Sequence, residues 1–236
     1  MPFDSLPEHI LKSLDRPIWT ALNSDQSHLG IHDSVASAFY ADVAPFATAG
    51  PIGFEDSEAL IRLAAYHPKG IAMLQAKPIS TPDGLIETGR CDCVQMLATS
   101  MLAASERRHL FTLKPRDIPE IIDLVERNGL GPFNRNTIVM GTHLGIRVSG
   151  NLVAVAGERI TFPGFRELGF VCVHPEHRGR GYARYLISLL ATQIISLGDT
   201  AFVHVEVDNA AAIGLFEKLG FKVRREMVAA RFEVPV

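Results

Sequence analysis

The chain has 236 residues, of which 47% are hydrophobic, so it is long enough for one large domain or two small ones with their own cores. Its formal net charge of −3 gives no general attraction to nucleic acids or to acidic membranes. The longest uncharged apolar stretch, residues 185–197, is too short to span a bilayer.

The first half, residues 1–108, carries no recognisable catalytic motif. It begins without the basic and apolar segments of a signal peptide, so we expect a cytoplasmic protein. Helical patterns are predicted near 7–14, 33–39 and 57–65, and strand-like runs at 70–76 and 91–97, separated by loops rich in Pro and Gly at 44–53 and 77–89. The charged stretch Glu106-Arg107-Arg108 is predicted to link this half to the second, residues 109–236.

The three cysteines are Cys91, Cys93 and Cys172, an odd number without a disulfide framework, which fits a reducing compartment. The Cys91-Asp92-Cys93 segment has no companion cluster of Cys or His that would complete a zinc site. We therefore expect ordinary strand or core thiols and no metal.

The second half opens with a predicted strand at 110–113 and a helix for which Asp117 can serve as N-cap, with Pro119 in its first turn. Its apolar residues recur at helical spacing, and Asn128-Gly129 ends it. Runs at 142–148 and 152–159 predict a hairpin that turns at Ser149-Gly150-Asn151.

The remaining pattern alternates between strands and helices. A strand at 167–173 leads through a glycine-rich loop into a helix at 185–197. A strand at 201–207, a helix at 210–219 ended by Gly220, and two closing strands at 221–225 and 229–234 follow. This order predicts an α/β (α+β) fold with a mixed sheet.

The loop Arg178-Gly179-Arg180-Gly181-Tyr182-Ala183 is the most informative segment. A helix N-terminus offers free N–H groups and the positive end of a dipole, and glycines let those groups approach an anion. The two arginines can add charge-assisted hydrogen bonds to a pyrophosphate. The spacing matches neither the nucleoside triphosphatase loop nor the dinucleotide-binding glycine pattern.

Two ordered signatures carry a family resemblance. Arg178, Gly181 and Ala183 form Arg-x-x-Gly-x-Ala, which resembles the acetyl-CoA pyrophosphate loop of the GNAT acetyltransferase superfamily. Downstream, the segment from Asn209 through Ala212 and Phe216 to Gly220-Phe221 resembles the second GNAT signature. The motif-bearing match covers about 166–225, and with weaker stretches about 110–236. The whole chain resembles tandem members related to glycine N-acyltransferases, in which a degenerate GNAT-like half precedes a catalytic half.

The resemblance implies a GNAT fold, a mixed twisted sheet with helices on both faces. It also implies an acetyl-CoA-dependent N-acetyltransferase that transfers the acetyl group directly to a primary amine of a small molecule or amino acid, without a metal, nucleic acid or membrane partner. The strand before the loop would splay from its neighbour and bind the donor through its backbone. The implied donor-binding residues are Val171, Cys172, Val173, Arg178, Gly179, Arg180, Gly181, Tyr182, Ala183, Arg184, Asn209 and Phe216.

Glu167 is the candidate general base, because it lies eleven positions before Arg178, where the histone-acetylating branch of the superfamily carries its glutamate. A base at this position needs a pKa raised by partial burial. Glu206 in the next strand is the main alternative, and His204 is a weaker one. Two of these residues also have a purely structural interpretation, Glu167 as an exposed strand-end carboxylate and His204 as a core histidine.

Phe216 departs from the family pattern, which has Tyr there as the acid for the leaving thiolate, and phenylalanine cannot donate a proton. Either the thiolate leaves without this acid, or Tyr182, Tyr185 or water substitutes for it. The alternative function is a CoA-binding sensor without turnover. A generic phosphate or nucleotide binder would explain the loop but not the second signature. The acceptor groove is expected between the hairpin and the first half, where Gly131-Pro132-Phe133 forms either part of its wall or a simple turn.

Overall fold

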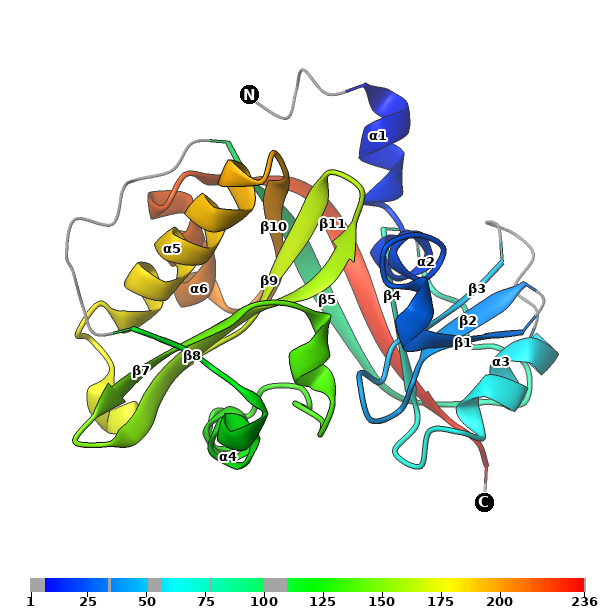
Figure 1. The fold of residues 1–236 in the computed structure, drawn as a ribbon. Coiled ribbons are helices and arrows are strands. Elements are labelled where there is room, and N and C mark those ends of the chain that lie inside the picture. Colours follow the sequence, from blue (N-terminus) through cyan, green and yellow to red (C-terminus); the bar gives the residue numbers. More distant parts are fainter. Residues whose placement is uncertain (1–6, 34, 51–56, 77, 100–109, 236) are drawn as a thin grey trace.

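An eight-stranded sheet organises the molecule (Figure 1), with strand order β4-β11-β5-β10-β9-β8-β7-β6. The computed structural model describes residues 7–33, 35–50, 57–76, 78–99 and 110–235. β9 and β10 run parallel, and the other neighbouring pairs of this sheet are antiparallel. The strands are β4 (Ile71–Gln75), β5 (Ile86–Ala98), β6 (Phe111–Thr112), β7 (His143–Val148), β8 (Asn151–Phe162), β9 (Phe165–Val173), β10 (Thr200–Glu206) and β11 (Phe221–Glu233).

Helices cover both faces of this sheet, which confirms the mixed GNAT-type architecture. α5 (Tyr182–Ser196) and α6 (Ala210–Lys218) pack over one hydrophobic core. The opposite face is covered by α1 (Glu8–Ser13) and α2 (Pro17–Leu22) over a second core and by α4 (Ile118–Arg127) over another. Within the described residues, no helix combines the length and apolar character needed to cross a membrane.

A second, three-stranded sheet of order β1-β2-β3 lies beside the large one. It consists of β1 (Gly30–Asp33), β2 (Ala36–Phe39) and β3 (Ala47–Ala49), and α3 (Ser57–Ala64) packs on it. The predicted helix at 33–39 is therefore wrong. Alanine favours helices intrinsically, but Ala36 and Ala38 are buried in the middle strand of this small sheet. Packing in the folded protein therefore determines the secondary structure of this segment, and the intrinsic preference of alanine does not.

The elements that lead to the site follow their sequence signals. α4 begins with Pro119 in its first turn, buries Ile121, Leu124 and Val125, and ends where Gly129 adopts a φ of 66°. The hairpin of β7 and β8 turns at Ser149 and Gly150, both with positive φ, as a two-residue turn requires.

The C-terminal strand is a single element. β11 runs from Phe221 to Glu233 without a break, so the prediction of two closing strands is wrong. Its register shifts between Val223 and Arg225, which marks a bulge at Arg224. The bulge turns the Arg224 side chain toward Asp15 and Gln95.

β5, from the first half, lies between β10 and β11 of the second half. It pairs with β10 from Cys93 to Leu97 and with β11 along almost its whole length. The predicted boundary at 108/109 falls within residues 100–109, outside the described residues, and remains a prediction. Strands that precede this boundary in the sequence and strands that follow it nevertheless form one sheet.

Candidate active site

The parallel strands β9 and β10 separate immediately after Glu167. Their pairing covers Phe165 to Glu167 against Thr200 to Phe202 only. β9 continues along β8 to Val173, whereas β10 continues along β5. This is the splay that the resemblance implies, and it leaves one side of β9 available to a ligand that binds like an added strand.

A distortion in β9 marks the place where the strands part. Two residues, Phe170 and Val171, oppose Ala156 of β8, and Phe170 has a φ of 54°. A positive φ is rare for a bulky residue and clusters at ligand sites. A bulge changes the direction in which backbone groups point, and this one includes Val171, the first of the strand residues predicted to bind the donor.

The glycine-rich loop enters α5 through two glycines whose backbone is left-handed. Gly179 and Gly181 have φ values of 75° and 76°, and Gly181 is the N-cap of α5 without a side-chain cap. The first-turn N–H groups of an α-helix have no intrahelical acceptor. A Cβ on Gly179 would meet nothing within 4 Å, so backbone conformation rather than space requires glycine there.

The two loop arginines are exposed and differ in their tethers. The guanidinium of Arg178 donates to Oδ1 of Asn128 at 2.8 Å, and so joins the loop to the end of α4. Arg180 makes a longer contact, 3.4 Å, with the carbonyl oxygen of Glu176. Arg180 is therefore the more easily redirected toward an anion.

The strand residues before the loop divide between the two faces. Val171 and Val173 are half-buried against the core under α5. The Cys172 side chain points to the other face, where Sγ lies 3.9 Å from the carbonyl oxygen of Leu124. Burial raises the pKa of the Cys172 thiol to about 12, and the positive charge of Arg178, which lowers this pKa, offsets only part of the rise. A thiol that stays protonated is not a nucleophile.

Glu167 is fully buried in a network of paired groups. Oε2 accepts from Nε of Arg159 at 2.9 Å, and Oε1 accepts from Nη2 of Arg159 at 2.5 Å and from Nδ1 of His204 at 2.7 Å. Burial alone would raise the pKa of Glu167, but the charge of Arg159 and the hydrogen bonds outweigh it and hold the pKa at about 2. The raised pKa expected of a base at this position is not found.

The other candidates occupy different surroundings. Glu206 is exposed at the end of β10, beyond the point where β9 and β10 separate. Asn209 caps α6 by accepting from the N–H of Ala212 at 3.1 Å. Phe216 is buried and packs edge-on against Phe221, with ring centroids 5.1 Å apart. Tyr182 and Tyr185 are half-buried at the start of α5, next to the same core.

The loop after α4 meets both the distorted part of β9 and the first half. Phe133 is buried edge-on against Phe170, at 4.9 Å between centroids, and against His143, at 5.3 Å. Burial lowers the pKa of His143 to about 4, despite its hydrogen bond with Gly141. Thr137 donates to the carbonyl oxygen of Val43 at 2.6 Å. Sequence reasoning missed the positive φ of Phe170 and the aromatic contact between Phe133 and Phe170.

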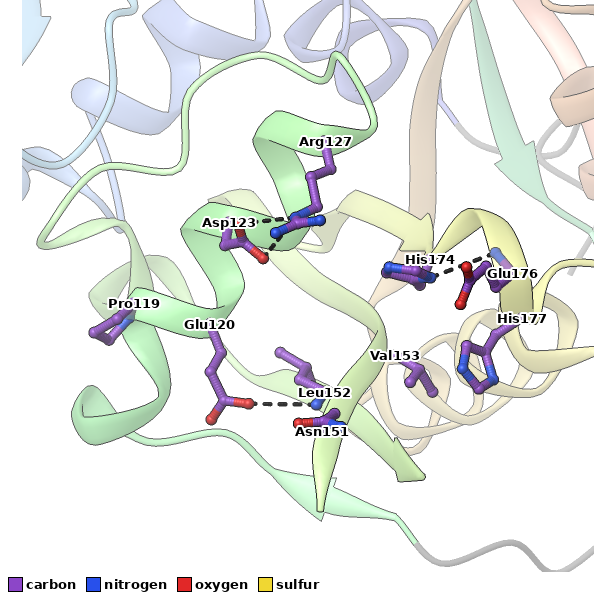
Figure 2. A pocket seen from close by; sticks show the side chains of 10 residues that line it. All are labelled: Pro119, Glu120, Asp123, Arg127, Asn151, Leu152, Val153, His174, Glu176 and His177. Carbon is purple, nitrogen blue, oxygen red and sulfur yellow. Dashed lines mark hydrogen bonds and ion pairs between the residues drawn. The ribbon is translucent and has the colours of Figure 1, made fainter. Parts of the chain in front are cut away.

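A cavity of about 530 Å³ lies between α4, the start of β8 and the segment before the loop (Figure 2). Two of its three carboxylates are paired: Asp123 binds Arg127 at 2.8 Å, and Glu120 binds Arg147 at 2.7 Å. None of the predicted donor-binding residues lines it, so we do not assign it to the acyl donor. The lining residues are Pro119, Glu120, Asp123, Arg127, Asn151, Leu152, Val153, His174, Glu176 and His177.

Comparison with known proteins agrees with this fold. The family model described as FR47-like protein matches residues 143–230. A crystal structure of a GNAT-family acetyltransferase from Novosphingobium aromaticivorans is 30% identical, with a TM-score of 0.86, and the match covers 94% of this chain and 99% of that one. A GCN5-related N-acetyltransferase from Kribbella flavida shares the fold at a TM-score of 0.56 and 13% identity, over 94% of both chains.

A curated relative shares a shorter segment. A Yersinia pestis protein named acetyltransferase is 41% identical over 56 residues, which are 23% of this chain and 40% of that protein. The shared segment therefore spans less than half of that relative's length. Because the Novosphingobium protein matches along nearly its whole length, the chain belongs to the GNAT family of acetyltransferases.

Proposed function

We propose that the protein transfers an acetyl group from acetyl-CoA directly to a primary amine of a small molecule or amino acid. The observation that carries the proposal is the splay of β9 from β10 beside a cradle of left-handed glycines at the start of α5. A pantetheine arm fits the free side of β9, and a pyrophosphate fits the cradle. The residues proposed to hold the donor are Val171 to Val173, Arg178 to Arg184, Asn209 and Phe216.

The backbone of β9 supplies the polarising group in this proposal. An N–H of Val171, Cys172 or Val173 donates to the thioester carbonyl and stabilises the negative charge that develops on its oxygen. The bulge at Phe170 fixes the direction of these N–H groups. The donor itself contributes the activated acyl group and a thiol leaving group.

The proton of the attacking amine is assigned to Glu167, acting through water because its side chain is fully buried. Its carboxylate is ionised throughout the usual assay range, since its pKa is held at about 2. A base of such low pKa has a small driving force for proton transfer. Glu206, exposed at the end of β10 beyond the point of separation, is the alternative proton acceptor.

Two observations favour a second candidate, a CoA-binding protein without turnover. Phe216 stands where the family acid is expected, and Glu167 has a lowered rather than a raised pKa. Release of CoA thiol from acetyl-CoA over a panel of amines separates the candidates. Turnover supports the first, and tight CoA binding without turnover on any amine supports the second.

Calorimetry adds a test of the site itself. We expect one acetyl-CoA per chain, bound in competition with CoA and not with nucleoside triphosphates. Two equivalent sites would mean that the first half binds the donor as well. Displacement by nucleotides would favour a generic phosphate binder.

A further inference from the structure

A row of buried and half-buried polar side chains crosses five neighbouring strands on the face opposite α5. In strand order β8, β9, β10, β5 and β11, its members are Arg159, Glu167, His204, Gln95 and Arg224. Gln95 and Glu167 are fully buried, and the His204 side chain is 4% exposed. Gln95 is the member supplied by the first half of the chain.

Hydrogen bonds at both ends fix the orientation of the Gln95 amide. Its Nε2 lies 2.9 Å from the carbonyl oxygen of Leu14, which can only accept a hydrogen bond. Its Oε1 lies 2.8 Å from Nη1 of Arg224, which can only donate. The NH₂ group therefore faces Leu14 and cannot be exchanged with the oxygen.

This orientation determines the tautomer of His204. Nε2 of Gln95 also lies 3.0 Å from Nε2 of His204, and because the amide nitrogen donates, the ring nitrogen must accept. The ring hydrogen is then on Nδ1, which donates to Oε1 of Glu167 at 2.7 Å. A chain of donors thus runs from Gln95 through His204 to the Glu167 carboxylate.

We propose that Gln95 is a positioning residue, which sets the tautomer of His204 and thereby aims the carboxylate of Glu167. The effect on turnover rests on the proposed acetyl transfer. Gln95 is held in turn by Arg224, whose Nη2 donates to the carbonyl oxygen of Leu11 and to Oδ1 of Asp15, both at 2.7 Å. The first half, through β5 and the segment around α1, therefore completes the site of the second half.

The first test observes the tautomer in the full-length chain labelled with ¹⁵N-histidine. The His204 signals, assigned by their loss in His204→Asn, should show a hydrogen on Nδ1 and none on Nε2. Gln95→Glu replaces the donating NH₂ with an accepting oxygen, so a hydrogen should appear on Nε2. An Nε2–H ring in the unchanged protein would overturn the proposal.

The second test separates positioning from simple stabilisation. Gln95→Met should lower kcat about 10-fold while the KM for acetyl-CoA stays within about twofold. Gln75→Met is the matched control, because Gln75 is also a buried glutamine of the first half, but it donates to Pro78 at 3.4 Å, outside the row. The control should lose thermal stability without losing kcat.

Unchanged kcat in a folded Gln95→Met protein, or equal losses of kcat in both variants, would refute the positioning role. If Gln95→Met does not fold, the nearly isosteric Gln95→Glu carries the kinetic test. If the unchanged protein transfers no acetyl group, the proposed function fails. The His204 signals of the unchanged and Gln95→Glu proteins then test, without any activity measurement, whether Gln95 sets the tautomer of His204.

Discussion

The guanidinium of Arg159 binds both carboxylate oxygens of Glu167, with Nε 2.9 Å from Oε2 and Nη2 2.5 Å from Oε1. A bidentate pair of this kind fixes direction as well as charge. It keeps Glu167 ionised inside the protein, where burial alone would favour the neutral acid. The pair joins β8 to β9 just before β9 leaves β10, so it also stabilises the base of the splay.

Glu167→Gln should lower the turnover number by about 10²–10⁴-fold, the usual contribution of a general base, while acetyl-CoA affinity is kept. The loss should shrink at high pH, where more of the free amine is already deprotonated. Steady-state rates from neutral to alkaline pH, with calorimetric affinities, check this. Glu206→Gln is the matched variant, and turnover lost there but kept in Glu167→Gln would transfer the role to Glu206.

Stability should fall with acid in two successive pH windows that overlap slightly. The pKa of His143 is lowered from 6.5 to about 4, so its burial as a neutral ring contributes stability that is lost as pH falls from 6.5 toward 4. The pKa of Glu167 is lowered from 4.5 to about 2, so its contribution is present above 4.5 and is lost as pH falls toward 2. Urea melts of His143→Asn should lack the first decline and keep the second. The same decline in both proteins would contradict this assignment.

Much of the second half was predictable because its signals are local. The turn at Ser149-Gly150, the proline at the start of α4 and each of the two signatures, at 178–183 and 209–221, depend on a few neighbouring residues. The failures come from non-local packing. Ala36 and Ala38 are strand residues because they are buried between neighbouring strands and under α3. The position of β5 between β10 and β11 produces no pattern in the sequence near β5.

The place of Glu167 in the fold was predictable, and the electrostatics around it were not. The strand predicted at 167–173 corresponds to β9, which begins at Phe165, and Glu167 lies in it where β9 and β10 separate. The environment of its carboxylate depends on Arg159 from β8 and His204 from β10, with Gln95 from β5 behind them. No sequence pattern joins these residues, since their contacts exist only after the sheet has formed.

The loop arginines should differ in what their removal does. Arg180→Ala should weaken acetyl-CoA binding by about 1–3 kcal/mol with little change in melting temperature, since Arg180 makes only a 3.4 Å contact with Glu176 among the contacts described for it. Arg178→Ala should weaken binding and also loosen the loop from Asn128. Arg231→Ala, an exposed arginine on β11, is the control. Equal affinity in Arg180→Ala and the control would remove Arg180 from the site.

Gly181→Val should abolish most acetyl-CoA binding. Gly181 has a φ of 76°, a conformation that a β-branched residue adopts only with strain, and a side chain there would also enter the cradle. Calorimetry on a protein shown to be folded by circular dichroism gives the answer. Affinity equal to that of the unchanged protein would exclude this loop as the pyrophosphate site.

Residues 110–236 alone should not fold into a stable unit. Without β5, the ladders of β10 and β11 lose their shared partner, and the core containing Leu97, Phe202 and Met227 is exposed. Circular dichroism and acetyl-CoA calorimetry of the fragment, beside the full chain, make the comparison. A fragment with a cooperative melt and full affinity would show that the predicted boundary at 108/109 is also a folding boundary.

Phe216→Tyr should leave turnover within about twofold and lower the melting temperature. Phe216 is 4% exposed, lies edge-on to Phe221 and belongs to the apolar core under α5, so burying an added hydroxyl there should cost about 1–3 kcal/mol. Phe221→Tyr, on the other ring of the same pair, is the control for a buried hydroxyl. Faster turnover in Phe216→Tyr and not in the control would mean that the edge of the Phe216 ring faces the leaving thiolate, and that the family's acid can be restored at this position.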